Sequence, residues 1–289
     1  MKKWLPYTGA IAVVIFCCFF FFIPFRVSRI VSGRCLLSAA DRCFTDTSRW
    51  ADWWPKTSGM SYRITGVTYN QVRISLGLAD GNQVAGTFTI APLSPDSILF
   101  RWDCRSAGIG FRKELGNRME AVLDSFRTFI QSSRNIYGVN FHQTMSHDST
   151  LVVLVSDDTT YPATGEVYKK IDSLEGYIAS QHAAATGLPW LNVTHLRDGR
   201  YRVTVAMPTD RRLDGIGRIV PQRYVPWKQI EGDVYGGPHA IEQAFQKMLL
   251  FKYDHVLTII AQPYQYLIID RRQQPDTSKW VTRVCAPTT

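Results

Sequence analysis

The sequence predicts an α+β protein in which an N-terminal membrane-spanning helix precedes two folded domains. Three features of the chain lead to this fold class. A long apolar run stands near the N-terminus, a series of antiparallel-type strands leads into one long amphipathic helix, and the order strand–helix–strand–strand then occurs twice. We therefore divide the chain into an anchor over 4–25, a first domain over 26–139 and a second domain over 140–289.

The apolar run over 4–25 carries no charged residue between Lys3 and Arg26. A helix needs about 20 apolar residues to cross the hydrocarbon core of a bilayer, and inside lipid its backbone groups must be paired within the helix. A cleaved signal peptide is the alternative, but its apolar region is shorter, about 7–15 residues, and ends at small residues. We therefore expect a retained single-pass anchor. Basic residues flank both ends of the run, so the side of the membrane that the soluble part occupies stays undetermined.

The formal net charge of +9 does not by itself indicate a nucleic-acid partner. Residues 1–34 contain five basic side chains and no acid, which leaves about +4 for the rest of the chain. No basic cluster with interleaved aromatic side chains follows, and no helix-turn-helix segment is evident. We therefore expect no binding to nucleic acid, and we assign the basic residues beside the anchor to lipid head groups.

The sequence also lacks the motifs of the common catalytic and metal sites. The six histidines form no HExxH pair, and neither a GxSxG elbow nor a GxxxxGK[ST] phosphate loop occurs. The four cysteines outside the apolar run are scattered without CxxC spacing, so we expect buried thiols rather than a zinc site or a disulfide framework. We predict no catalytic residue, no metal ligand and no cofactor.

The first domain is expected to begin with a strand over 26–34 and short helices over 36–54, and to end with an amphipathic helix over 111–134. Turn signals divide the segment between them into strands over 61–68, 71–78, 83–91 and 97–104. A curved antiparallel sheet that wraps around a long helix leaves a gap between the two. That gap is the first candidate ligand site.

The second domain shows the repeated order of elements. Its first copy is predicted as a strand over 149–157, a helix over 162–184 and strands over 190–196 and 200–207. Its second copy is predicted as a strand over 224–235, a helix over 238–251 and strands over 264–270 and 280–286. Such a repeat indicates two copies of one unit packed about a pseudo-twofold axis. The groove between the copies is the second candidate ligand site.

The short helices of the first domain end in Trp50-Ala51-Asp52-Trp53-Trp54-Pro55. This W-x-x-W-W-P ending, after a strand and short helices, resembles the opening of the START-like (SRPBCC, polyketide cyclase-like) superfamily of hydrophobic-ligand proteins. Trp53 and Trp54 are interpreted as core residues, with a cap on the first ligand site as the alternative.

Three stretches of the second domain carry another resemblance. They are the strand end Val205–Pro208, the strand-to-helix turn in Asp233–Ile241, and the final hairpin in Pro263–Pro287. Together they resemble the GyrI-like effector-binding domain, which is also attached to AraC-type regulators. The succession of the two domains behind one anchor resembles a class of bacterial membrane-anchored proteins.

The second resemblance implies a site for lipophilic, often cationic, compounds between the two repeats. Some members are linked to small-molecule hydrolysis, and many carry a pocket glutamate in a P-x-E-x-Y context. Here Pro263-Tyr264-Gln265-Tyr266 places Gln265 at that position. Glutamine keeps the shape and the hydrogen-bonding capacity of glutamate but has neither its charge nor its titratable proton. Cation selectivity and hydrolysis are both weakened by the change.

Gln265 is therefore the first candidate ligand-binding residue. The aromatic candidates for the same groove are Tyr177, Tyr201, Tyr235, Tyr266 and Trp280, with ordinary core packing as the alternative for each.

The function expected from these features is a membrane-tethered, non-enzymatic protein that binds or senses a lipophilic small molecule. Its partners would be that molecule and the lipid bilayer. One alternative is a small-molecule hydrolase that uses the groove of the second domain. The other is an interaction module with collapsed pockets that binds a membrane or envelope protein.

Overall fold

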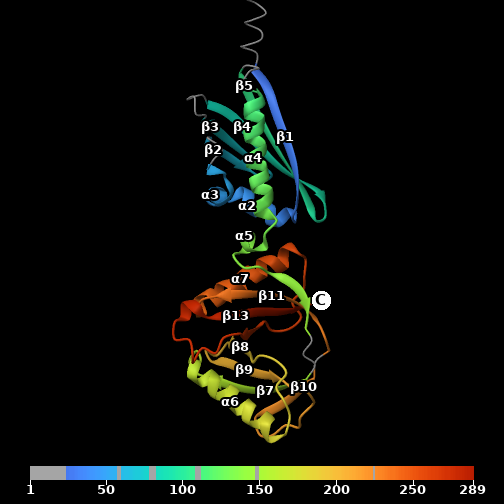
Figure 1. Cartoon of the computed structure of the whole chain (residues 1–289), viewed down its shortest axis with the longest axis vertical. Helices are drawn as coiled ribbons and strands as arrows, with labels where there is room; N and C mark the ends of the chain where they lie inside the picture. The colour runs from blue at the N-terminus through green and yellow to red at the C-terminus, as the bar shows by residue number, and fades with distance from the viewer. Residues whose placement is uncertain (1–23, 57–59, 78–82, 108–111, 147–149, 224) are drawn as a thin grey trace, which may run out of the picture. The chain divides into compact units, whose positions relative to one another are not determined.

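The computed structural model describes residues 24–56, 60–77, 83–107, 112–146, 150–223 and 225–289. The described residues form a mixed α+β structure with two antiparallel sheets (Figure 1). The chain divides into two compact units after Ile136, a few residues before the boundary expected from the sequence.

The expected anchor lies outside the described residues, apart from Pro24 and Phe25. These two residues begin strand β1 (Pro24–Arg34), where they are in register with Ala107 and Ser106 of β5. The anchor end expected at residue 25 is therefore wrong by two residues, because an apolar residue at the end of such a run fits a strand equally well. Among the described helices, none combines the length and apolarity that crossing a membrane requires.

Within the described residues, the first unit is a five-stranded antiparallel sheet in the order β1-β5-β4-β3-β2, with helix α4 packed on it (Figure 1). Its further elements are α2 (Leu37–Thr45), η1 (Thr47–Arg49), α3 (Trp50–Trp53), β2 (Ser61–Thr68), β3 (Gln71–Gly77), β4 (Gln83–Ser94), β5 (Ser97–Ala107), α4 (Arg112–Ile130) and α5 (Ser133–Tyr137). In β3, Val72, Ile74 and Leu76 alternate with exposed or half-buried residues, as expected for a sheet with one covered face.

Aromatic side chains fill the space between this sheet and its helices. Phe126 of α4 stands 4.6 Å, between ring centroids, from both Trp53 and Phe100. The indole N–H of the fully buried Trp50 donates to the carbonyl of Phe44 at 2.8 Å. The cluster is completed by Trp54, Phe88 and Trp102. The first candidate ligand gap is thus occupied by core side chains, Trp53 and Trp54 included.

The described cysteines of both units fit the expectation of buried thiols. Cys43, Cys104 and Cys285 are buried, and Cys35 is half-buried. Burial raises the pKa of the Cys104 thiol to about 12, so this group stays protonated at neutral pH.

The second unit has the repeated order that the sequence predicts. Its elements are β6 (His142–Met145), β7 (Thr150–Asp158), α6 (Thr164–Ser180), β8 (Trp190–His195), β9 (Tyr201–Pro208), β10 (Ile219–Arg223), β11 (Lys228–Tyr235), α7 (Pro238–Asp254), β12 (Tyr264–Leu267), η3 (Thr277–Lys279) and β13 (Val281–Thr288). The two copies are β7-α6-β8-β9 and β11-α7-β12-β13.

The strands of the second unit form one sheet in the order β10-β7-β9-β8-β12-β13-β11-β6. Each half of this order mirrors the other about the central β8–β12 pair, where Leu191 is in register with Gln265. The outermost strands β6 and β10 were not expected from the sequence. Both are edge strands with few buried residues, so they lack the apolar alternation that marks a strand.

Candidate functional site

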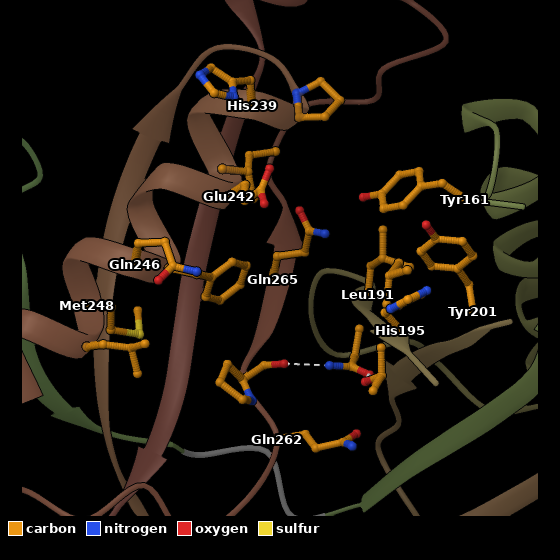
Figure 2. A pocket seen from close by; sticks show the side chains of 18 of the residues that line it. Tyr161, Leu191, His195, Tyr201, His239, Glu242, Gln246, Met248, Gln262 and Gln265 are labelled. Atoms are coloured by element: carbon orange, nitrogen blue, oxygen red, sulfur yellow. Dashed lines mark hydrogen bonds between the residues drawn. The ribbon is translucent and has the colours of Figure 1, made fainter. Parts of the chain in front are cut away.

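A groove of about 880 Å³ lies on the helical face of the second sheet, beside the central strand pair (Figure 2). One wall is helix α7, and the other is formed by β8, the start of β9 and the segment before α6. Its lining is mostly apolar and aromatic: Tyr161, Leu191, Val193, Tyr201, Pro238, Ile241, Phe245, Met248, Leu249, Ile259 and Pro263, with the polar residues Asn192, Thr194, His195, His239, Glu242, Gln246, Gln262 and Gln265.

The local sequence explains both walls. On α7, Ile241, Phe245 and Met248 recur at helical spacing and so share the face that looks onto the sheet. Strands β8 and β12 pair only at Trp190 and Leu191. Beyond Leu191, the side-chain amide of Asn192 donates to the backbone carbonyl of Pro263 at 2.7 Å. The ladder between β8 and β12 is therefore short, and the groove lies along the part of β8 that continues past it.

The aromatic wall opposite α7 carries polar groups. Tyr161 and Tyr201 meet edge to face with ring centroids 5.7 Å apart, and His195 lies 4.9 Å from Tyr201. Burial raises the pKa of the Tyr161 hydroxyl, the charge of Glu242 raises it further, and Arg271 opposes the shift. The hydroxyl therefore stays protonated at neutral pH and is available as a donor at the edge of an apolar surface.

A smaller chamber of about 310 Å³ adjoins the groove. The two share the lining residues Tyr161, Leu191, Pro238, Ile241 and Gln265. The chamber is completed by the first turn of α6 and by Tyr168, Arg271 and Trp280. Groove and chamber are therefore neighbouring parts of one site, and the charged side chain of Arg271 belongs to the chamber.

Arg271 is the charged group of the chamber. Its guanidinium donates to the hydroxyl of Thr282 at 2.9 Å and to the amide oxygen of Gln265 at 3.3 Å, and it lies 4.5 Å over the ring of Trp280. Burial lowers the pKa of Arg271, although the group stays charged at neutral pH. Among the described residues, no carboxylate forms an ion pair with it.

Three of the residues predicted for the groove line this site, namely Gln265, Trp280 and Tyr201 of the aromatic wall. Gln265 is 6% exposed and lies at the junction of groove and chamber, between Glu242 and Gln246 of α7 and the opposite aromatic wall in Figure 2. Trp280 is buried in the chamber lining, and its indole N–H donates to the carbonyl of Gln274 at 2.7 Å.

The other three predicted residues do not line the groove. Tyr266 follows Gln265 on β12 and therefore points to the opposite face of the sheet, where it lines a separate pocket. Tyr177 is buried in the apolar core under α6, and its hydroxyl donates to the carbonyl of Asp214. Tyr235 ends β11 with 68% of its surface exposed.

Sequence reasoning missed three functional groups of the site, namely Tyr161, Glu242 and Arg271. Tyr161 lies in a loop, and Glu242 is one polar residue on an amphipathic helix, so neither carries a motif. In the doublet Arg271-Arg272 nothing in the sequence tells which side chain lines the chamber.

No group of three His, Cys, Asp or Glu side chains comes together closely enough to hold a metal ion within the part of the chain that the structure describes.

No protein-family model matches the chain. No curated protein matches it either.

Solved structures resemble the chain at low sequence identity. The EcmrR–DNA complex is 12% identical, covers 61% of this chain and 71% of its own, and has a TM-score of 0.43. SAV2435 bound to tetraphenylphosphonium is 16% identical, covers 52% of this chain and 93% of its own, and has a TM-score of 0.34. A START superfamily protein from Mycobacterium smegmatis is 16% identical, covers 37% of this chain and 97% of its own, and has a TM-score of 0.31.

Proposed function

We propose that this protein binds or senses a lipophilic small molecule in the groove of its second unit, and that it does so without catalysing a reaction. The observation that carries the proposal is the groove itself. Its volume of about 880 Å³ and its apolar lining with a few convergent polar groups match the usual character of small-molecule sites. The open groove also counts against the alternative of an interaction module with collapsed pockets.

The domain assignments belong to the same proposal. We assign residues 26–139 to a START-like domain and 140–289 to a GyrI-like effector-binding domain. The mirrored order of the second sheet and the position of Gln265 in the groove support the second assignment. In the first unit the filled interior favours a structural role, so ligand binding is assigned to the second unit alone.

Membrane tethering is the remaining part of the proposal, and it is supported by the sequence. The run over 4–25, without the two residues that begin β1, still supplies about 20 residues for a spanning helix. A lipophilic ligand is concentrated in a bilayer, so an anchor would hold the groove near its source.

A groove-filling variant tests the binding function. Gln246 is exposed and lines the groove, whereas Gln243, also exposed on α7, does not. Gln246→Trp should block the groove, and Gln243→Trp makes the same chemical change outside it. The full chain in lipid nanodiscs is titrated with water-soluble eight-carbon amphiphiles, with empty nanodiscs as the blank.

Binding at 100 times the dissociation constant stabilises a protein by about 2.7 kcal/mol, which a thermal melt detects readily. We expect this shift in the wild type and in Gln243→Trp and its loss in Gln246→Trp. The absence of any shift with every amphiphile, or equal shifts in all three proteins, would refute the proposal.

A further inference from the structure

We propose that the ligand is an anionic amphiphile, whose carboxylate or phosphate oxygens bind Arg271 in the small chamber while its apolar body lies in the groove. The inference rests on the proposed binding function and adds the charge of the ligand and its direction in the site. It reverses the expectation, carried by the family resemblance, that such a groove attracts cations.

The first argument is the state of Arg271. A guanidinium has five N–H donors, and both hydrogen bonds to side chains, to Thr282 and Gln265, come from the same terminal nitrogen and reach neutral oxygens. Arg271 is half-buried, and a charge that is partly removed from water is costly unless a counter-charge accompanies it. The neighbouring Arg272 shows the contrast, because it is exposed and pairs with Asp270 at 2.8 Å and Asp172 at 2.9 Å.

The second argument is the orientation of Gln265. Its amide oxygen accepts from Arg271, so its amide nitrogen is the end left to face the site. The side chain is buried, and no described acceptor takes up this donor. A glutamate here would lie within ion-pairing distance of Arg271 and neutralise it. With glutamine, the chamber keeps a net positive charge and gains a second donor for an anion.

The backbone beside the chamber also contributes positive potential. Pro238 in the first turn of α7 lines the chamber, so the N-terminal end of this 17-residue helix lies beside it. Helix N-termini carry partial positive charge and favour anions. The end of α6 also reaches the chamber at Thr164, but it already holds the carboxylate of Glu166, which accepts from the backbone N–H of Ala163 at 3.2 Å. The end of α7 therefore supports the charge of Arg271 rather than replacing it.

Glu242 gives the ligand its direction. Its carboxylate lines the groove but not the chamber, and it is exposed to solvent. Arg271 is half-buried, so solvent screens its charge less than it screens the charge of the exposed Glu242. An anionic head group is therefore attracted to Arg271 and repelled by Glu242, which places the head in the chamber and the apolar body along α7.

The test compares probes that share one eight-carbon body: octanoate, octyl phosphate, octanol and octyltrimethylammonium. Each is titrated calorimetrically into the full chain in nanodiscs of neutral lipid. We expect the two anions to bind about 10-fold to 100-fold more tightly than octanol, as a hydrogen-bonded charge pair contributes. The cation should bind most weakly. The ratio of octanoate to octyl phosphate affinity then distinguishes a carboxylate from a phosphate ligand.

Two variants assign the preference to the chamber. Arg271→Gln should lower the affinity for the two anions by about 10-fold to 100-fold, and it should change the affinity for octanol by no more than about twofold. Gln265→Glu keeps Arg271 and supplies a counter-charge to it, so this variant should also abolish the anion preference. It provides a second test in case Arg271→Gln impairs folding. Arg272→Gln removes the neighbouring, paired arginine and should change no affinity.

The outcomes separate the two proposals. Equal binding of all probes, tightest binding of the cation, or an unchanged anion affinity in both Arg271→Gln and Gln265→Glu would overturn the anionic head group and leave the lipophilic groove standing. Failure of octanol and of every charged probe to bind would overturn both.

Discussion

Replacing Phe126 with alanine tests whether the interior of the first unit is a packed core or a ligand cavity. Phe126 is 2% exposed on α4, and its ring meets Phe100 on the sheet and Trp53 on α3 at 4.6 Å. The side chain therefore joins three elements at one point. Buried Phe-to-Ala changes cost about 3–5 kcal/mol, because the transfer free energy of the ring is lost and a cavity remains.

The change should be visible in thermal unfolding. For a domain of about 100 residues, 1 kcal/mol corresponds to about 4–8 °C, so the melting temperature of the first unit should fall by about 12–40 °C. The assay is differential scanning calorimetry of the full chain, supported by tryptophan fluorescence in urea. Tyr69→Ala truncates an aromatic residue of the same unit that is 87% exposed, and it should change stability by less than about 0.5 kcal/mol.

A small effect would refute this interpretation of the first unit. If Phe126→Ala cost less than about 1 kcal/mol, the ring would not be closely packed, and the START-like gap would be a ligand site after all. The proposal that the first unit is structural and that the second unit alone binds the ligand would then have to be abandoned.

Two further predictions concern stability. Burial opposes ionisation of Asp103, but hydrogen bonds from Arg26 and Arg101 outweigh it and lower the pKa of the carboxyl. The ionised carboxylate stabilises the fold above its unfolded pKa of about 3.9, and this contribution is lost as pH falls through the lower folded pKa. Asp103→Asn should therefore weaken the loss of unfolding free energy at acid pH, measured by urea titrations at several pH values. An unchanged dependence of the unfolding free energy on pH would contradict this prediction. Gly86→Ala should destabilise by about 1–3 kcal/mol, since its Cβ would lie 2.8 Å from the indole nitrogen of buried Trp102. A Cβ added at Gly176 in α6 would have no atom within 4 Å, so Gly176→Ala should instead stabilise the helix by about 0.5–1 kcal/mol. Equal effects of the two glycine substitutions on stability would contradict the packing argument.

The sequence predicts those parts of the fold in which burial is periodic. The helices α4, α6 and α7 and most strands alternate apolar and polar residues with the period of their structure, so their approximate bounds could be predicted. The edge strands β6 and β10 could not, because a strand with little buried surface has no such period. Their position follows from pairing with strands far away in the chain.

The site was predictable only in part, for reasons of geometry. Gln265 and Tyr266 are adjacent on one strand, and neighbouring strand residues face opposite sides of a sheet, so they could not both line one groove. This error was avoidable from the sequence alone. The place of Arg271 in the chamber could not be predicted, because the choice between it and Arg272 depends on Asp172, which is 100 residues away from Arg272 in the chain.

The second unit shows how a nearly symmetric scaffold supports an asymmetric site. Its strand order is mirrored about the β8–β12 pair, and at that pair the two copies contribute different side chains, Leu191 and Gln265. The half-buried cation, Arg271, follows β12 and therefore belongs to one copy only. A symmetric groove would bind an amphiphile equally well in either direction, whereas a single charge beside one end selects one direction. For the membrane-tethered protein that we propose, this would be the difference between a general apolar surface and a site that distinguishes a lipid-like anion from the neutral and cationic molecules dissolved in the same membrane.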